Sequence, residues 1–255
     1  MININGKRAY TGGGKMKPTA QPLGGGCTIF VSENHRYGTD ALLLADFAAV
    51  GKSGLVCDLG TGCGIIPLIW CRNGFTGRAY GVDIMPEAIE LCRRSVEENG
   101  LGDIFTPLCA DLRYIRTELA AGKFDLVTMN PPYKRAGAGA RSANESLNAA
   151  RSEEMCTIED IAAAAKYLLK FGGRLCLCCR TERLADVICA MRGAGIEPKR
   201  LRMVIQRAGS SPSLFLAEGK KGGRPGIAVM PDLVIEDDGG WSKEMKKIYG
   251  SFAKE

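Results

Sequence analysis

The sequence predicts an α/β fold in which a mostly parallel sheet of seven strands has helices on both faces. Short apolar segments alternate along the chain with longer helical segments, an order typical of parallel sheets with right-handed crossovers. The chain has 255 residues, of which 45% are hydrophobic and 24% charged, enough for one full domain of ordinary globular composition. A glycine-rich turn follows the first apolar segment, and ligands of parallel sheets bind at such strand ends.

The elements follow from short apolar runs, helical segments and turn residues. The expected strands cover residues 55–59, 78–83, 104–109, 124–129, 174–179, 200–206 and 213–217. The expected helices cover residues 65–72, 86–99, 158–171 and 184–193. Pro86 begins the second helix, where its missing N–H group costs nothing, and Asn99 and Gly100 end it. Gly172 and Gly173 end the third.

Three further segments complete the expected organisation. Residues 1–20 are expected to be a flexible lead-in, and residues 21–255 a single domain. Residues 134–153 are small, polar and unpatterned, so we expect a mobile lid over the substrate. The first 22 residues lack the apolar segment of a signal peptide, and no apolar run approaches the roughly 18 residues of a membrane span. We therefore expect a cytoplasmic protein with no membrane partner.

The chain has eleven cysteines, an odd number, and one histidine. Cys57, Cys109, Cys176 and Cys178 fall inside expected buried strands, where a free cysteine behaves as a small hydrophobic residue. No pair of Cys-x-x-Cys spacings indicates zinc. We expect neither disulfides nor a metal site.

The net charge of +6 is unevenly distributed. Residues 160–225 contain 13 Lys and Arg against 5 Asp and Glu. A local surplus of this kind favours a polyanionic partner such as nucleic acid, although a solvated basic surface would give the same pattern.

Residues 58–64 form an Asp-x-Gly-x-Gly-x-Gly turn between the first strand and its helix. The dinucleotide fingerprint has a third glycine where this chain has Ile65. A carboxylate at Asp58 would repel a pyrophosphate but suits the ammonium group of a bound amino acid. Asp83, at the end of the second strand, can accept hydrogen bonds from both ribose hydroxyls. The pattern favours S-adenosylmethionine over a nicotinamide cofactor or a simple tight turn.

Asp111 ends the third strand, where it can accept a hydrogen bond from the cofactor's adenine amine. The alternative is that Asp111 caps the following turn.

Residues 130–133, Asn-Pro-Pro-Tyr, directly follow the fourth strand. Two prolines remove two N–H groups and stiffen the corner. The corner presents amide and proline carbonyls beside an aromatic ring, which suits a planar group bearing an NH2. The alternative is a rigid turn.

Together, residues 58–64 and 130–133 resemble class I methyltransferases of the Asn-Pro-Pro-Tyr type, with their Rossmann-like fold. Residues 35–44, 150–154, 222–226 and 241–249 are similar to the bacterial tRNA1(Val) (adenine-N6)-methyltransferase family. The likeness covers roughly residues 20–250. The chain departs from the family at residues 206–212, which lack a His-Pro-Lys-Pro-like stretch, and at Ser152, which replaces a histidine.

The resemblance implies S-adenosylmethionine as cofactor and N6-methylation of an adenine in tRNA near the anticodon. The residues expected to be catalytic are Asn130, Pro131, Pro132 and Tyr133. Those expected to bind the cofactor are Tyr37, Gly38, Thr39, Asp40, Asp58, Gly60, Thr61, Gly62, Gly64, Asp83, Ile84, Asp111, Leu112 and Asn130. Those expected to bind RNA are Lys134, Arg135, Arg141, Arg151, Arg207, Lys220 and Lys221, with Arg200, Arg202 and Arg224 as further candidates.

In the expected mechanism, the carbonyls of Asn130 and Pro131 accept the two hydrogens of the adenine amine, while Tyr133 stacks on the flipped base. A glutamine amide on a protein offers the same NH2 group, so a protein glutamine N-methyltransferase remains an alternative. A DNA adenine-N6 methyltransferase and a catalytically silent RNA-binding scaffold are the others. The basic surplus favours nucleic acid over protein.

Overall fold

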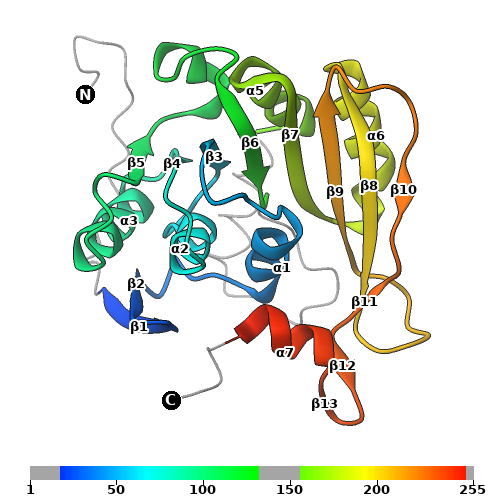
Figure 1. The fold of residues 1–255 in the computed structure, drawn as a ribbon, viewed down its shortest axis with the longest axis horizontal. Coiled ribbons are helices and arrows are strands. Elements are labelled where there is room, and N and C mark those ends of the chain that lie inside the picture. The colour runs from blue at the N-terminus through cyan, green and yellow to red at the C-terminus, as the bar shows by residue number, and fades with distance from the viewer. Residues whose placement is uncertain (1–17, 132–155, 251–255) are drawn as a thin grey trace.

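The fold is built on one twisted sheet (Figure 1). The computed structural model describes residues 18–131 and 156–250. The main strands are β3 (Leu55–Leu59), β4 (Arg78–Asp83), β5 (Phe105–Cys109), β6 (Phe124–Met129), β7 (Leu169–Arg180), β8 (Ile196–Ile205) and β9 (Leu214–Lys221). Their order across the sheet is β5-β4-β3-β6-β7-β9-β8. All pairs are parallel except those of β9, which runs antiparallel between β7 and β8.

Helices cover both faces of this sheet, as the alternating sequence predicts (Figure 1). One face packs against α1 (Thr39–Phe47), α2 (Ile65–Arg72) and α3 (Pro86–Glu98), and the other against the 3-10 helix η1 (Leu112–Thr117), α5 (Ile158–Leu168) and α6 (Leu184–Gly193). A short 3-10 turn, η2 (Thr181–Arg183), leads into α6. Strand residues alternate between the two cores: Val56 and Leu126 belong to the first, and Cys57 and Val127 to the second.

The expected elements are confirmed, with shifts of one residue at β5 and α3 and of four to five residues at one end of β7, β8 and β9. The bounds of β3, α2, β4, β6 and α6 are those predicted. The helix predicted to reach Phe171 ends at Leu168, because Leu169 is already extended and pairs with Phe124 at the start of β6. Sheet pairing therefore overrides helix propensity over the last three residues, a tertiary effect that a local pattern does not contain.

Two segments near the described N-terminal end form elements that the sequence pattern did not predict. Strands β1 (Thr19–Gly24) and β2 (Cys27–Val31) form a hairpin, so Thr19 and Ala20 belong to a strand and not to a flexible lead-in. The hairpin lies along α3, where the Asn99 amide bonds both the N–H and the carbonyl of Thr28. Helix α1 follows and fills the space between α2 and β7.

The C-terminal part adds strands to the far edge of the sheet. Two short strands, β10 (Ala228–Val229) and β11 (Leu233–Val234), each pair with β8, which raises the expected seven strands to nine. A small hairpin of β12 (Glu236–Asp237) and β13 (Gly240–Trp241) precedes α7 (Lys243–Tyr249), which packs on α1 (Figure 1). Within the described parts of the chain, no helix has the length and apolarity needed to cross a bilayer.

None of the cysteines is joined in a disulfide. Cys57, Cys176 and Cys178 are fully buried in strands, as expected. Cys109 is exposed, contrary to the prediction, because it is the last residue of β5, which is the strand at the edge of the sheet.

Candidate active site

The register of the sheet brings the expected site residues to neighbouring strand ends. Leu59 pairs with Val82 on one side and with Met129 on the other. The residues that follow these three, Gly60, Asp83 and Asn130, therefore leave the sheet next to one another. Asp83 in turn pairs with Cys109, two residues before Asp111. The carboxyl ends of four adjacent strands thus form one continuous edge, where ligands of parallel sheets bind.

The turn after β3 depends on glycine backbone geometry. Gly60, Gly62 and Gly64 all have positive φ, at 64°, 56° and 87°. Residues other than glycine rarely adopt this backbone conformation. At Gly64 an added Cβ would also lie 2.5 Å from Cys92 Sγ, whereas at Gly62 it would meet nothing within 4 Å. Gly64 is therefore needed for packing, while Gly62 faces open space beside the turn.

Asp83 fixes the turn to the end of β4. Its Oδ2 accepts a hydrogen bond from Gly62 N at 2.9 Å, and its Oδ1 accepts one from Met85 N at 2.9 Å. Burial raises the pKa of Asp83, although these two amide bonds oppose the shift. Each carboxylate oxygen has a second lone pair for a ligand.

Asp58 lies deeper than expected. It is 1% exposed, and its Oδ1 accepts a hydrogen bond from Thr128 Oγ1 at 2.7 Å. Burial raises the pKa of Asp58 to about 7, even though the Thr128 bond lowers it. Asp58 therefore lies beneath the turn and does not offer an open surface to a ligand.

Asp111 follows the capping alternative. Its Oδ1 accepts from Arg113 N at 2.9 Å, which caps η1, and the Arg113 guanidinium pairs with both carboxylate oxygens. Burial alone would raise the pKa of Asp111, but the bonds from Arg113 outweigh burial and hold the pKa below its usual range. A cofactor amine would have to share this carboxylate with Arg113.

Asn130 meets the start of α1 across a sequence distance of 90 residues. Its Nδ2 donates to Asp40 Oδ2 at 3.0 Å. Gly38 is the N-cap of α1 and Thr39 its first residue, so Asp40 lies in the first turn of the helix. The segment of residues 37–40 is thereby brought to the same edge as the glycine turn.

The other expected cofactor residues lie around this edge. Tyr37 is half-buried against the first core and Ile84 follows Asp83, while the largely buried Leu112 packs in the second core. Thr61 is buried in the glycine turn, where its N–H donates to Val82 O at 3.0 Å. Pro131, the last described residue before the gap at residues 132–155, is half-buried.

Several expected residues lie outside the described part of the chain: Pro132, Tyr133, Lys134, Arg135, Arg141 and Arg151, together with the whole proposed lid of residues 134–153.

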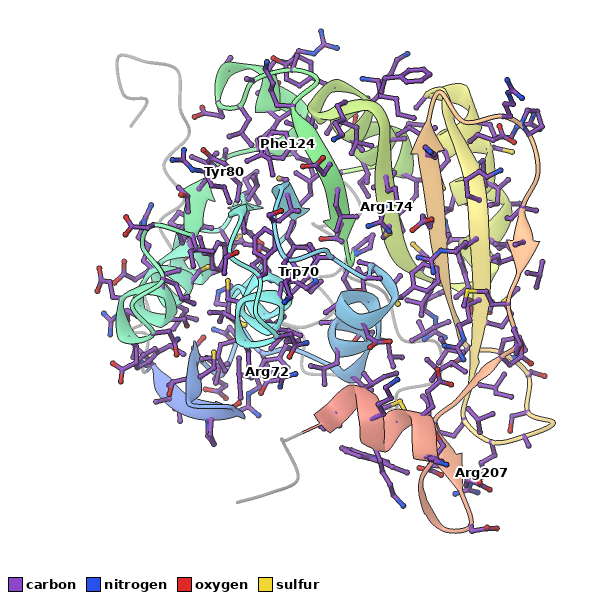
Figure 2. The ribbon with its side chains drawn as sticks, in the orientation of Figure 1. Trp70, Arg72, Tyr80, Phe124, Arg174 and Arg207 are labelled. Atoms are coloured by element: carbon purple, nitrogen blue, oxygen red, sulfur yellow. The ribbon has the colours of Figure 1, made fainter. Side chains whose placement is uncertain are left out.

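The remaining RNA candidates are divided between the two ends of the sheet. Arg207, which Figure 2 labels, follows β8 at the carboxyl edge and forms an ion pair with Glu236 of β12. In the sheet, the backbone of Lys220 on β9 lies opposite that of Arg174, in the amino-terminal half of β7. Lys221 Nζ donates to the carbonyls of Lys166 and Leu169. Since Leu169 pairs with the first residue of β6, Lys221 lies roughly 20 Å along the sheet from Asn130.

Arg200, Arg202 and Arg224 were also RNA candidates. Arg200 pairs with Glu218, and Arg202 pairs with Glu244. Both arginines therefore have partners within the fold, so their charges are not free for a polyanion. Arg224 is exposed, and its carbonyl accepts a hydrogen bond from Lys199 Nζ at 3.2 Å.

Sequence reasoning missed two residues of this edge, Thr128 and Arg113. A hydroxyl among the apolar residues at the end of this strand was the available signal for Thr128, since a buried polar side chain needs a partner. For Arg113, the signal was its position two residues after a strand-end Asp.

The strand order gives this chain the fold of class I methyltransferases. The sheet has the 3-2-1-4-5 order of doubly wound proteins, with an antiparallel strand inserted before the last main strand. It resembles a predicted O-methyltransferase from Agrobacterium tumefaciens, with a TM-score of 0.66 at 22% identity over 82% of this chain and 95% of that chain. It also resembles a precorrin-6y C5,15-methyltransferase from Geobacter metallireducens, with a TM-score of 0.54 at 12% identity over 75% and 92%.

The chain belongs to the methyltransferase small domain family, which its residues 27–188 match. A tRNA1(Val) (adenine(37)-N6)-methyltransferase of Porphyromonas gingivalis is 30% identical over 158 residues, which are 60% of this chain and 61% of the relative. The match thus spans less than two thirds of that relative's length. Proteins of the same name are 26% identical in a Flavobacteriaceae bacterium, over 66% of this chain and 76% of the relative, and 27% identical in Aeromonas hydrophila, over 71% and 75%.

Proposed function

We propose that this protein is an S-adenosylmethionine-dependent methyltransferase that methylates N6 of an adenine in tRNA. One observation carries the proposal: the glycine turn after β3 and Asn130 after β6 leave adjacent, paired strands at the same residue level. A methyl donor at the turn and an NH2 group at Asn130 would then be neighbours. Relatives named tRNA1(Val) (adenine(37)-N6)-methyltransferase support the choice of substrate, which would make the protein cytoplasmic.

The residues at the turn fit S-adenosylmethionine. Both oxygens of Asp83 accept backbone hydrogen bonds at 2.9 Å and have lone pairs left for ribose hydroxyls. Gly62 leaves room for close approach to the backbone. The carboxylate of Asp58 beneath the turn favours a cationic ligand over a pyrophosphate.

In the proposed reaction, the main task of the protein is to position the two reactants. When bound, S-adenosylmethionine would supply an electrophilic methyl group and leave as S-adenosylhomocysteine, and the proton released by the methylated amine would pass to water. The carbonyl oxygens of Asn130 and Pro131 would accept hydrogen bonds from the two N–H groups of the adenine amine, which directs the nitrogen lone pair toward that methyl. No strong base is needed, since the amine becomes acidic only as it is alkylated. Holding two reactants in line is itself a large part of the acceleration.

Asn130→Ala tests this proposal. We expect the variant to lose at least 100-fold in methyl transfer while its affinity for S-adenosylmethionine, measured by calorimetry, stays within about twofold. The assay incubates labelled S-adenosylmethionine with bulk tRNA and the full chain, followed by nucleoside mass spectrometry. Transfer by the variant at the wild-type rate would contradict the assignment.

The same assay distinguishes the substrate classes. Label in N6-methyladenosine of tRNA supports the proposal. Label in protein would instead indicate a glutamine amide, and label in DNA a DNA adenine, both of which carry the same NH2 group.

A further inference from the structure

The contact between Asp40 and Asn130 joins two elements that are distant in the sequence. Asn130 Nδ2 donates to Asp40 Oδ2 at 3.0 Å, and the contact is half-buried. Asp40 belongs to the first turn of α1, and Asn130 follows the last residue of β6. The bond therefore determines how the Asn130 side chain is turned relative to the glycine edge.

The position of the Asp40 carboxylate is itself constrained. Its Oδ1 folds back over Gly38, where an added Cβ would overlap it. Gly38 is also the N-cap of α1, and its carbonyl accepts from Ala41 N at 3.2 Å. The start of α1 thus holds the Asp40 carboxylate in place at the strand end.

A carboxylate partner removes the ambiguity of an amide. The two ends of an Asn amide have nearly the same shape, but one end donates and the other accepts. An ionised carboxylate only accepts, so the NH2 end of Asn130 must face Asp40 and its carbonyl Oδ1 must point the other way. A charged acceptor on the NH2 side also polarises the amide, which strengthens Oδ1 as an acceptor.

We propose that Asp40 is a positioning residue that sets the orientation of the Asn130 amide, so that its carbonyl faces the NH2 group to be methylated. This inference rests on the proposed function and assigns Asp40 a task other than the cofactor binding expected from the sequence. Without Asp40 the amide can rotate by 180° and present its NH2 end to the target amine, where two donors would oppose each other.

The test compares Asp40→Ala and Asp40→Asn with the matched control Asp46→Ala, an exposed Asp on the same helix. For Asp40→Ala we expect kcat to fall about 10- to 100-fold, the loss typical of a charge-assisted hydrogen bond. The affinity for S-adenosylmethionine and the KM for tRNA should stay within about twofold. Asp40→Asn should recover part of kcat, because its carbonyl can still accept from Asn130. Asp46→Ala should match the wild type.

A double-variant cycle separates this role from general damage to the fold. In the Asn130→Ala background, Asp40→Ala should change the residual rate by less than about twofold, because residues acting as a unit are not additive. An equal loss in both backgrounds would overturn the inference, and so would a tenfold loss of cofactor affinity, which would make Asp40 a cofactor ligand.

Failure of the positioning role can be distinguished from failure of the proposed function. An active wild type with an inactive Asn130→Ala and a fully active Asp40→Ala refutes only the positioning role. A wild type that transfers no methyl group to tRNA, protein or DNA refutes the proposed function and with it the positioning role.

Discussion

Asp58 carries a carboxylate that is ionised at neutral pH in the unfolded chain but half-protonated in the folded one. Burial raises its pKa to about 7, against an ordinary value of 3.8. Its neighbours Thr128 and Asp83 act in opposite directions, since the hydroxyl of Thr128 favours the charged form and the charge of Asp83 disfavours it. Ionising Asp58 inside the fold therefore costs free energy that the unfolded chain does not spend.

The pH dependence of stability should show this cost. Between pH 4 and 7 the folded state binds the Asp58 proton and the unfolded state does not, so this residue makes the protein less stable as the pH rises. In Asp58→Asn this pH-dependent contribution to stability is absent, because Asn does not titrate, while the Thr128 hydroxyl keeps an acceptor. We expect the free energy of unfolding of the variant to gain about 2–3 kcal/mol on the wild type between pH 5 and pH 8.

Urea unfolding of both proteins at several pH values measures this difference. Curves of unfolding free energy that stay parallel across the range would show that Asp58 titrates normally.

At the scale of elements, the C-terminal end of α1 is held by two arginines from the sheet. Arg174 on β7 donates to Ala48 O, and Arg200 on β8 donates to Phe47 O (Figure 2 labels Arg174). Both also pair with Glu218 of β9, at 2.7 Å. Burial alone would raise the pKa of Glu218, but the bonds from Arg200 and Arg174 hold the pKa below its usual value. One carboxylate thus connects three strands to the helix that carries Asp40.

Removing this carboxylate should loosen α1. We expect Glu218→Gln to lower the free energy of unfolding by about 2 kcal/mol, since it leaves two partly buried guanidinium groups without their charged partner. The matched control is Glu236→Gln, whose partner Arg207 is 72% exposed and whose loss should cost less than about 0.5 kcal/mol.

Equal losses in the two variants, measured by denaturant unfolding at pH 7, would remove Glu218 from this role. A second readout is hydrogen exchange of the α1 amides, which should become faster only in Glu218→Gln.

At the scale of the whole molecule, the basic RNA candidates that lie within the described residues do not form one surface. Arg207 lies at the β8 end of the carboxyl edge, the edge that carries Asn130. Lys221 lies at the opposite, amino edge, where its Nζ donates to backbone carbonyls. A tRNA whose base reaches Asn130 would therefore lie along the carboxyl edge and leave the amino edge free.

Salt dependence of tRNA binding tests this arrangement. Each phosphate contact contributes about 0.9 to the slope of log affinity against log salt. We expect Arg207→Gln to reduce the slope by about one contact and Lys221→Gln to leave it unchanged. A flat salt response of the wild type would argue against a polyanionic substrate altogether.

Much of the fold was predictable because its signals are local. The apolar segments of β3, β4 and β6 and the helix start at Pro86 depend on side chains close in the sequence. The helices α1 and α7 and the hairpin β1–β2 were not predicted as elements. The hairpin packs on α3, α1 packs on α2, and α7 packs on α1, so each depends on a partner that is distant in the sequence. Leu169 joined a strand because Phe124, 45 residues earlier, offered it a pairing partner.

The sequence by itself determined the alternation of strands and helices, the three glycines of the turn and the presence of Asp83 and Asn130 at strand ends. Backbone sterics and residue order are enough for that. Only the tertiary structure decided that Asp58 is buried on Thr128, that Asp111 is engaged by Arg113, and that Asp40 bonds Asn130. These contacts join residues from separate elements, and their burial and electrostatics exist only once the sheet has set its register.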